Sequence, residues 1–271
     1  MLVLLVFVAG CEGTIDKADK AFEAGNFDKA ISLYRQSLEE KKHKAPEMAE
    51  IHFKIGRATD QLGKYDLAVD EYRTAVELKP DELKYYMAMA DDLDRLGMYE
   101  EEVSVLRNVL ILDKNNPHAE AMLGTSYAKL GQYMNALEEF KSALQHNPRD
   151  AQNYNNLGMV YDSLGDTEKA INFMEEGLKL SPDDNFTLQN IGAIYNKVKR
   201  YGDSARAYAR LVKLKPEVAK FHNQLGIAYY NNGQYKQAYA EFKAVENIDA
   251  KFPGLQDNVK LAQRGMNRSA K

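Results

Sequence analysis

Cysteine, tryptophan and proline are scarce in this chain of 271 residues, which has one cysteine, no tryptophan and seven prolines. A single cysteine excludes an intramolecular disulfide and a zinc site built on cysteines. Five scattered histidines leave little material for a histidine metal cluster. Few prolines beside many alanine, leucine, glutamate and lysine residues favour helices over a turn-rich β protein. We therefore expect an all-α fold with no metal and no cofactor.

An excess of positive charge is also lacking, because the formal net charge is −4 and the isoelectric point is near 5.8. This balance disfavours bulk binding to nucleic acid. Residues 12–150 carry 27 acidic and 19 basic side chains, a net charge of −8, whereas residues 151–271 carry 13 and 17, a net charge of +4. The two halves therefore present different electrostatic fields to partners.

The chain begins with an uncharged apolar run, MLVLLVFVAG, directly before its single cysteine, Cys11. The run is about half as long as the roughly 20 residues that a membrane-spanning helix needs, but it fits the apolar core of a secretory signal. The segment Val8-Ala9-Gly10-Cys11 resembles the lipobox of bacterial lipoproteins. This resemblance implies removal of residues 1–10 as a signal peptide and attachment of lipid, including palmitate-type acyl chains, to Cys11.

Glu12, and not an aspartate, follows the cysteine, which in lipoproteins of this kind implies the outer membrane, facing the periplasm. No lysine or arginine precedes Cys11, which departs from the usual positively charged start of such signals. The alternative interpretation is a short apolar tail at the start of the first helix, with Cys11 as a minor packing residue.

Small and aromatic residues recur with a period of 34 over more than 200 residues. In most repeats a small residue follows an apolar one, a glycine comes seven residues later, an alanine five residues after that, and a proline ends the repeat. The small residues are Gly56, Ala90, Gly124, Gly158, Gly192 and Gly226. This pattern resembles the tetratricopeptide repeat, which implies a superhelical solenoid of helix-turn-helix units.

The resemblance divides residues 11–252 into about seven units, and residues 253–271 follow as a capping helix and tail. One unit cannot bury its apolar face alone, so we expect the units to stack into one continuous solenoid. The pairs Asn116-Pro117 and Ser181-Pro182 are expected to be cap-plus-proline starts of helices. The expected units are 11–44, 49–82, 83–116, 117–150, 151–184, 185–218 and 219–252.

No catalytic constellation is present in the sequence, which has no phosphate-binding glycine loop, no HExxH and no G-x-S-x-G. We therefore expect a protein that is not an enzyme. His52 and His222 both fall at the fourth repeat position, where large residues pack between helices, so we interpret them as packing residues.

The concave surface remains as the candidate site, because helix positions 2, 5, 6, 9, 12 and 13 tend to line the groove in tetratricopeptide proteins. A carboxamide offers a donor and an acceptor together and can pair with a peptide group of an extended chain. Asn156, Asn190 and Gln224 are spaced by 34 and resemble the asparagine ladder in the tetratricopeptide domain of the N-acetylglucosaminyl transferase that glycosylates nuclear proteins. The alternative is an ordinary solvated helix face. The predicted partner-binding residues are Asn155, Asn156, Gln189, Asn190, Asn196, Lys197, Asn223, Gln224, Tyr230 and Asn231.

The same positions in the N-terminal half form a mixed, acid-leaning surface, and the Lys/Asn clamp of cytosolic chaperone-binding tetratricopeptide domains is not reproduced there. A basic zone in repeat 185–218 is either a solvated outer face or a site for an acidic partner or an anionic surface. Its members are Lys197, Lys199, Arg200, Arg206, Arg210, Lys213, Lys215 and Lys220.

These observations predict a lipid-anchored, non-enzymatic adaptor in the bacterial envelope that binds an extended peptide or a protein partner in its groove. The architecture resembles pilotins of pilus or secretion systems, adaptors of periplasmic proteases and outer-membrane assembly factors. Two alternatives remain open: an unanchored cytoplasmic co-chaperone or scaffold, and an enzyme accessory with a site formed across repeats.

Overall fold

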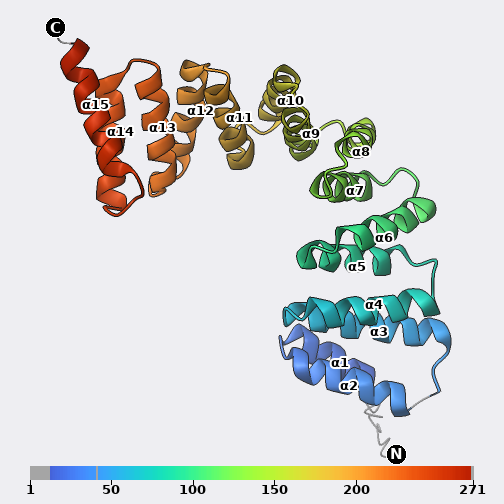
Figure 1. The fold of residues 1–271 in the computed structure, drawn as a ribbon. Coiled ribbons are helices and arrows are strands. Elements are labelled where there is room, and N and C mark those ends of the chain that lie inside the picture. The colour runs from blue at the N-terminus through green and yellow to red at the C-terminus, as the bar shows by residue number, and fades with distance from the viewer. Residues whose placement is uncertain (1–12, 41, 270–271) are drawn as a thin grey trace, which may run out of the picture. The chain divides into compact units, whose positions relative to one another are not determined.

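The computed structural model describes residues 13–40 and 42–269, which form fifteen helices and no strand. The expected all-α class is therefore confirmed over these residues. The chain divides into two compact units, which meet in sequence between Gln132 and Tyr133, and each is described here by itself (Figure 1). The expected stacking of all units into one continuous solenoid stays a prediction.

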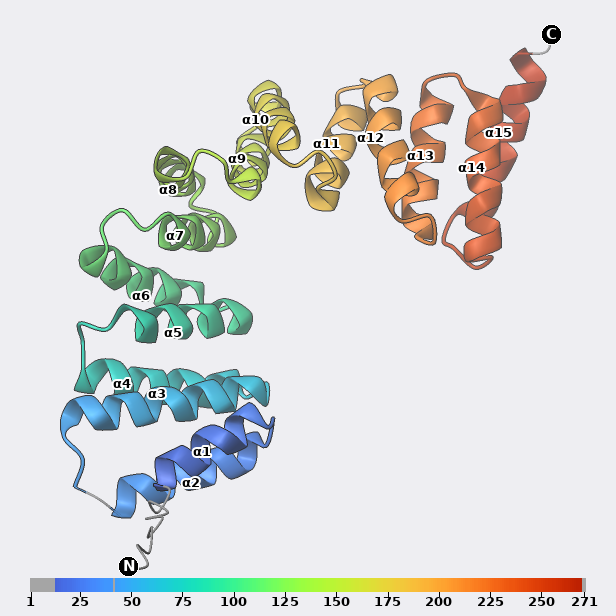
Figure 2. The same cartoon turned by 180° about the vertical axis from the view of Figure 1, so that it is seen from behind.

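The N-terminal unit is a stack of antiparallel helices in which each helix contacts the next along the chain (Figure 2). The first and third pairs fall in the expected windows 11–44 and 83–116, whereas the second pair begins at Ala45, four residues before the window 49–82. The helices are α1 (Thr14–Glu23), α2 (Phe27–Glu40), α3 (Ala45–Gln61), α4 (Tyr65–Leu78), α5 (Leu83–Leu96), α6 (Tyr99–Leu112) and α7 (Pro117–Lys129).

The C-terminal unit continues the same alternation of helices and ends with one unpaired helix (Figure 1). That last helix packs on α14 and also contacts α13, and its buried side chains include Leu255, Val259 and Ala262. The helices are α8 (Tyr133–His146), α9 (Ala151–Ser163), α10 (Thr167–Leu180), α11 (Asn185–Lys197), α12 (Tyr201–Leu214), α13 (Ala219–Asn231), α14 (Tyr235–Ile248) and α15 (Leu255–Ser269).

The repeated small residue allows the two helices of a pair to approach closely. A Cβ built on Gly56 would lie 2.4 Å from Cε1 of Tyr72, and one on Gly226 would lie 2.5 Å from Cε1 of Phe242. Both distances are too short for real side chains, so the aromatic ring of the second helix occupies the space that a Cβ would need. These rings are almost completely buried, and each adds a large buried apolar area to its helix pair.

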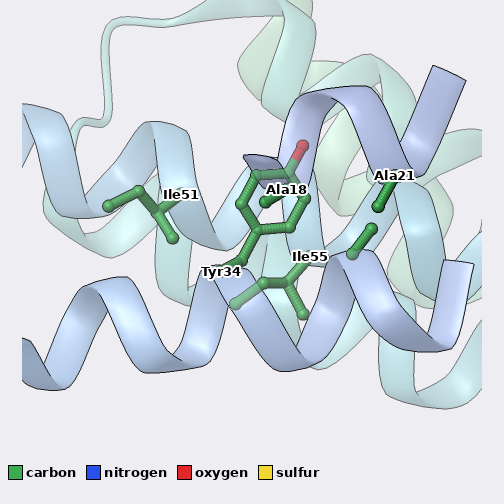
Figure 3. Packing of buried hydrophobic residues seen from close by; sticks show 6 residues of the cluster. Ala18, Ala21, Tyr34, Ile51 and Ile55 are labelled. Atoms are coloured by element: carbon green, nitrogen blue, oxygen red, sulfur yellow. The ribbon is translucent and has the colours of Figure 1, made fainter. Parts of the chain in front are cut away.

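The first pair uses alanine in place of glycine at this contact. Ala18 of α1 is fully buried against Tyr34 of α2, and Ile51 and Ile55 of α3 close the cluster (Figure 3). The core of the unit is therefore continuous from α1 to α3, because side chains of a neighbouring pair complete the cluster that the first pair begins.

One helix start differs from the sequence-based expectation. Asn116 caps α7, and its side chain accepts a hydrogen bond of 3.0 Å from the Ala119 N–H, as expected. Ser181, by contrast, follows the end of α10, and Asp184 caps α11 by accepting a 2.7 Å hydrogen bond from the Thr187 N–H. The Ser181-Pro182 prediction is wrong because an aspartate three residues later competes successfully for the exposed amides of the first turn.

Lys199 is the one non-glycine residue with positive φ among the described residues, with φ of 63°. It stands where the other repeats have a glycine, as at Gly165 and Gly233, which have φ of 85° and 76°. A side chain in this left-handed region costs roughly 1–2 kcal/mol, because its Cβ approaches the following carbonyl oxygen. The turn between α11 and α12 is therefore strained.

We predict that Lys199→Gly raises the free energy of unfolding by up to about 1 kcal/mol, because relief of strain exceeds the added freedom of the unfolded chain. Urea denaturation followed by circular dichroism measures the change. Gly165→Ala is the reciprocal control, since its new Cβ meets no atom within 4 Å. It should lower the free energy of unfolding by about 1 kcal/mol. A Lys199→Gly variant less stable than the parent would contradict the strain.

Candidate functional site

The candidate partner surface lies on the odd-numbered helices of the C-terminal unit. α9 contacts α11 directly, and α13 contacts α15, so side chains of successive odd-numbered helices meet. We call the polar surface at repeat positions 5 and 6 of these helices the amide face. Its members are Asn155, Asn156, Gln189, Asn190, Asn223, Gln224 and, on α15, Asn258.

Two hydrogen bonds between asparagines join successive helices of the amide face. Asn190 donates from Nδ2 to Oδ1 of Asn155 over 3.0 Å, and Asn258 donates from Nδ2 to Oδ1 of Asn223 over 3.0 Å. Both pairs have a sequence separation of 35, so they repeat the same geometry two helix pairs apart. The acceptors Asn155 and Asn223 are 8% and 7% exposed, which makes them parts of the packed interface as well as of the surface.

The pairing differs by one residue from the expected ladder with a spacing of 34. Asn190 bonds to Asn155 and not to Asn156, because the step between helices is diagonal at this position. Asn156 and Gln224 are half-buried, and no hydrogen bond from either side chain to another described residue is present. The amide face therefore combines asparagine pairs that are held in place with carboxamides that have no partner in the described part of the chain.

The remaining predicted site residues fall into two groups. Gln189 donates to the Asn185 carbonyl over 3.1 Å, and Lys197 binds Asp162 over 2.8 Å, so both side chains are held within the unit. Asn196 has a buried Oδ1 without a hydrogen-bond donor among the described residues, and the rings of Tyr230 and Tyr235 meet edge to face at 5.4 Å. Asn231 is exposed at the end of α13.

Two apolar residues on the same helices were missed by the sequence analysis. Phe186, at repeat position 2 of α11, is 73% exposed, and Met159, at position 9 of α9, is 42% exposed. Single exposed apolar side chains are common on protein surfaces, and these two become candidate contacts because they stand at repeat positions that line the groove. Their repeat positions could have identified them, because positions 2 and 9 belong to the groove-lining positions from which the amide residues were chosen.

Four of the eight cations of the predicted basic zone, Lys197 among them, form ion pairs within the unit. Arg200 and Arg206 both bind Asp203, and Arg210 binds Asp183 over 2.6 Å. These pairs reduce the field that a partner would meet and favour the interpretation as a solvated face. No ion pair with a described residue is present for Lys199, Lys213, Lys215 or Lys220.

The odd-numbered helices of the N-terminal unit carry matched charges in place of amides. Lys84 of α5 binds Glu50 of α3 over 2.8 Å, and Arg95 of α5 binds Asp60 of α3. Two acids of the expected acid-leaning surface, Glu50 and Asp60, are therefore paired with cations one repeat further along.

Two carboxyl groups are buried in the third helix pair. Asp92 and Glu102 are 1% and 2% exposed, and one oxygen of each lacks a hydrogen-bond donor among the described residues. Burial raises the pKa of Asp92 to about 7; the negative charge of Asp60 adds to this rise and Arg95 opposes it. Burial also raises the pKa of Glu102 to about 7. These two acids are expected to be largely protonated in mildly acidic solution.

The described residues hold no helix that is long and apolar enough to cross a membrane, and no group of three or more His, Cys, Asp or Glu placed to hold a metal ion. His52 and His222 each bind a glutamate of the partner helix over 2.7 Å, Glu71 and Glu241, which agrees with a packing role. The predicted lipid-attachment residue, Cys11, and the apolar run before it lie outside the described residues.

Family models identify the repeat directly. Two models of the tetratricopeptide repeat match the chain, one over residues 15–82 and 197–254 and the other over residues 118–183. These segments make up more than half of the sequence, so the chain belongs to the tetratricopeptide repeat family. Curated proteins gave no match.

Solved structures of tetratricopeptide proteins share the fold at low identity. A tetratricopeptide repeat protein from Parabacteroides merdae matches with a TM-score of 0.68 and 18% identity over 92% of this chain and 97% of its own. The Cut9–Hcn1 structure of the APC/C matches with 0.61 and 19% identity over 94% of this chain, which spans 57% of that chain. YrrB, described as a TPR protein with an unusual peptide-binding site, matches with 0.56 and 17% identity over 73% of this chain and 99% of its own.

The fold and family define a protein-interaction scaffold of a type that is typically non-catalytic.

Asp92 and Glu102 predict a pH dependence of stability. The pKa values of both carboxyl groups are higher in the folded chain than in the unfolded chain, where a carboxyl group titrates near pH 4. Their contribution to stability is therefore complete below about pH 4. It decreases as the pH rises from 4 to about 7 and is lost above that. Each group loses about 1.4 kcal/mol per pH unit up to its folded pKa, so the free energy of unfolding should fall by up to roughly 5 kcal/mol between pH 5 and pH 8, as measured by urea denaturation.

The double variant Asp92→Asn/Glu102→Gln isolates these two groups from histidines that titrate over the same range. It should remove most of the fall between pH 5 and pH 8, because neither amide ionises. A double variant with the same pH dependence as the parent would contradict the assignment.

Proposed function

We propose that this chain is a lipid-anchored adaptor of the bacterial envelope, whose C-terminal unit binds an extended segment of a protein partner along the amide face. The observation that carries the proposal is the repeated asparagine pair, Asn190 with Asn155 and Asn258 with Asn223. Each carboxamide has two N–H donors and an oxygen with two lone pairs. The pair uses one donor of Asn190 or Asn258, so the second N–H and the oxygen of these two half-buried residues remain available to a peptide backbone.

The pairs also lower the cost of binding. An amide that is already fixed in one rotamer loses little conformational entropy when a partner arrives, whereas ordering a free side chain costs about 0.5–1.5 kcal/mol. Asn156 and Gln224 lie beside the fixed pairs and add donors and acceptors without a described partner. Hydrogen bonding to the partner's backbone tolerates different side chains on the partner, which suits an adaptor that binds extended segments.

The exposed apolar residues supply the specificity in this proposal. Phe186 and Met159 are the large apolar side chains exposed on α11 and α9. A partner segment would place apolar side chains against them while its backbone meets the amides. YrrB, which shares the fold, is described as having an unusual peptide-binding site, which supports binding of a peptide by this architecture.

The anchor in the proposal is a lipid on Cys11, after removal of residues 1–10. It rests on the resemblance of Val8-Ala9-Gly10-Cys11 to a lipobox and on the position of the chain's single cysteine. Two or more acyl chains would give stable anchoring, at about 0.8 kcal/mol per buried CH₂. Glu12 then favours the periplasmic face of the outer membrane, where pilus, secretion or outer-membrane assembly machinery would supply the partner.

Alanine substitution of unpaired amides tests the amide face without breaking the packed pairs. We expect Asn156→Ala/Gln224→Ala to lose at least about tenfold in recovery of its specific partner from envelope extracts, because backbone hydrogen bonds are lost at two points. The triple variant that also carries Asn190→Ala should lose more, provided that circular dichroism shows intact helices. Recovery is measured by affinity capture and quantitative mass spectrometry.

The matched control is Asn172→Ala/Asn247→Ala, which removes two exposed amides from the even-numbered helices α10 and α14. Its partner recovery should equal that of the parent. Equal recovery for the control and for both amide-face variants would refute the proposed binding face.

Metabolic labelling with radioactive palmitate tests the anchor. The parent chain should take up label and fractionate with membranes, whereas Cys11→Ser should take up none, because the acylated thioether cannot form. Absence of label in both chains would leave an unanchored scaffold as the alternative.

A further inference from the structure

A hollow on the N-terminal unit carries charges that the proposed partner face does not explain. It has a volume of about 290 Å³ and lies among α1, α2 and α3. We call it the N-terminal pocket. Its lining consists of Asp19, Phe22, Glu23, Tyr34, Lys54 and Arg57.

The floor of the pocket is a closed hydrogen-bond network. Lys54 Nζ lies 2.8 Å and 2.7 Å from the two carboxylate oxygens of Asp19, and the Tyr34 hydroxyl donates to the same carboxylate over 2.5 Å. Burial and the bond to Asp19 raise the pKa of Tyr34, so its hydroxyl stays protonated. The charges of Lys54 and Asp19 cancel, and three helices hold them in position.

The rim carries one cation, Arg57, and one anion, Glu23, that form no ion pair with another described residue. The Arg57 guanidinium lies over the Phe22 ring at 5.0 Å from its centre, an arrangement that holds the planar group without using its N–H donors. In the described part of the chain no hydrogen bond or ion pair involves the side chains of Arg57 or Glu23. By comparison, Lys84 and Arg95 on the neighbouring repeat each bind a carboxylate of this unit.

The charges of the rim restrict the kind of ligand that fits. A guanidinium with free N–H groups favours a carboxylate, which it can bind with two parallel hydrogen bonds. A simple anion would be repelled by Glu23, and a simple cation by Arg57. A ligand that carries a carboxylate and an ammonium group on one small framework satisfies both, and the floor adds no net charge that would oppose it.

We propose that the N-terminal pocket binds a free α-amino acid, whose carboxylate pairs with Arg57 and whose ammonium group pairs with Glu23. The side chain of the amino acid lies against the edge of Phe22. A volume of about 290 Å³ accommodates a ligand of this size. This site is in the other unit from the amide face and does not depend on the proposed function.

Calorimetric titration tests the proposal with the full chain carrying Cys11→Ser, which cannot be acylated. The twenty L-α-amino acids are titrated singly, at up to about 10 mM, and the tightest binder is then compared with its N-acetyl and carboxamide derivatives. Because each derivative removes one charge, we expect both to bind at least about tenfold more weakly than the parent amino acid. Absence of binding by all twenty, or equal binding of either derivative, overturns the proposal.

Variants then locate the site. Arg57→Gln and Glu23→Gln should each weaken binding of the same amino acid by at least about tenfold, because a charge-assisted hydrogen bond is lost. Arg149→Gln and Glu39→Gln remove exposed charges elsewhere and should bind as the parent does. Circular dichroism verifies the helices of each variant. Unchanged affinity in Arg57→Gln or in Glu23→Gln overturns the assignment.

Discussion

The contact on which the whole structure depends is that between a small residue on one helix and a large ring or thioether on the next. Tyr72, Tyr208 and Phe242 occupy space in which the facing glycine has no Cβ. Met174 takes the same place against Gly158. The contact occurs in four helix pairs, at Gly56, Gly158, Gly192 and Gly226, and brings the two helices of each of these pairs close together.

Interactions between successive odd-numbered helices differ between the two units. In the N-terminal unit, Lys84 and Arg95 bind carboxylates of the preceding repeat, whereas in the C-terminal unit asparagine pairs take a comparable place. Exposed ion pairs are screened by salt and contribute little to stability, whereas neutral amides keep hydrogen-bonding capacity for a partner. The division of charge between the halves of the sequence thus corresponds to two chemically different faces.

Much of the fold could be predicted from the sequence, because the period of 34 identifies helix pairs and their close contacts. The grouping of helices into two compact units could not, since a repeat pattern reports on neighbouring helices only. The predicted helix start at Ser181-Pro182 was wrong, because more than one residue before α11 can act as an N-cap. The backbone geometry places Asp184 in that position. Lys199 likewise breaks the glycine pattern, and only the backbone shows that it still adopts the left-handed conformation.

The residues of the candidate site come from the repeat positions, and their binding of a partner stays a prediction. The pattern did not predict that Asn155 and Asn223 are buried or that Asn190 and Asn258 bond to them at a spacing of 35 and not 34. The repeat spacing could not predict the charges at the rim of the N-terminal pocket. Arg57 and Glu23 are of interest because neither side chain forms an ion pair or hydrogen bond with another described residue. Such an absence depends on side-chain positions in three dimensions.

A double-mutant cycle at one close contact tests this account most directly. Gly192→Ala places a Cβ about 2.9 Å from the Tyr208 ring and should destabilise the chain by roughly 1–3 kcal/mol. In Gly192→Ala/Tyr208→Leu the smaller side chain admits the new methyl group, so the two changes together should cost at least about 1 kcal/mol less than the sum of the single changes. Strictly additive effects, or a Gly192→Ala variant as stable as the parent, would contradict the claim that this contact sets the spacing of the repeats.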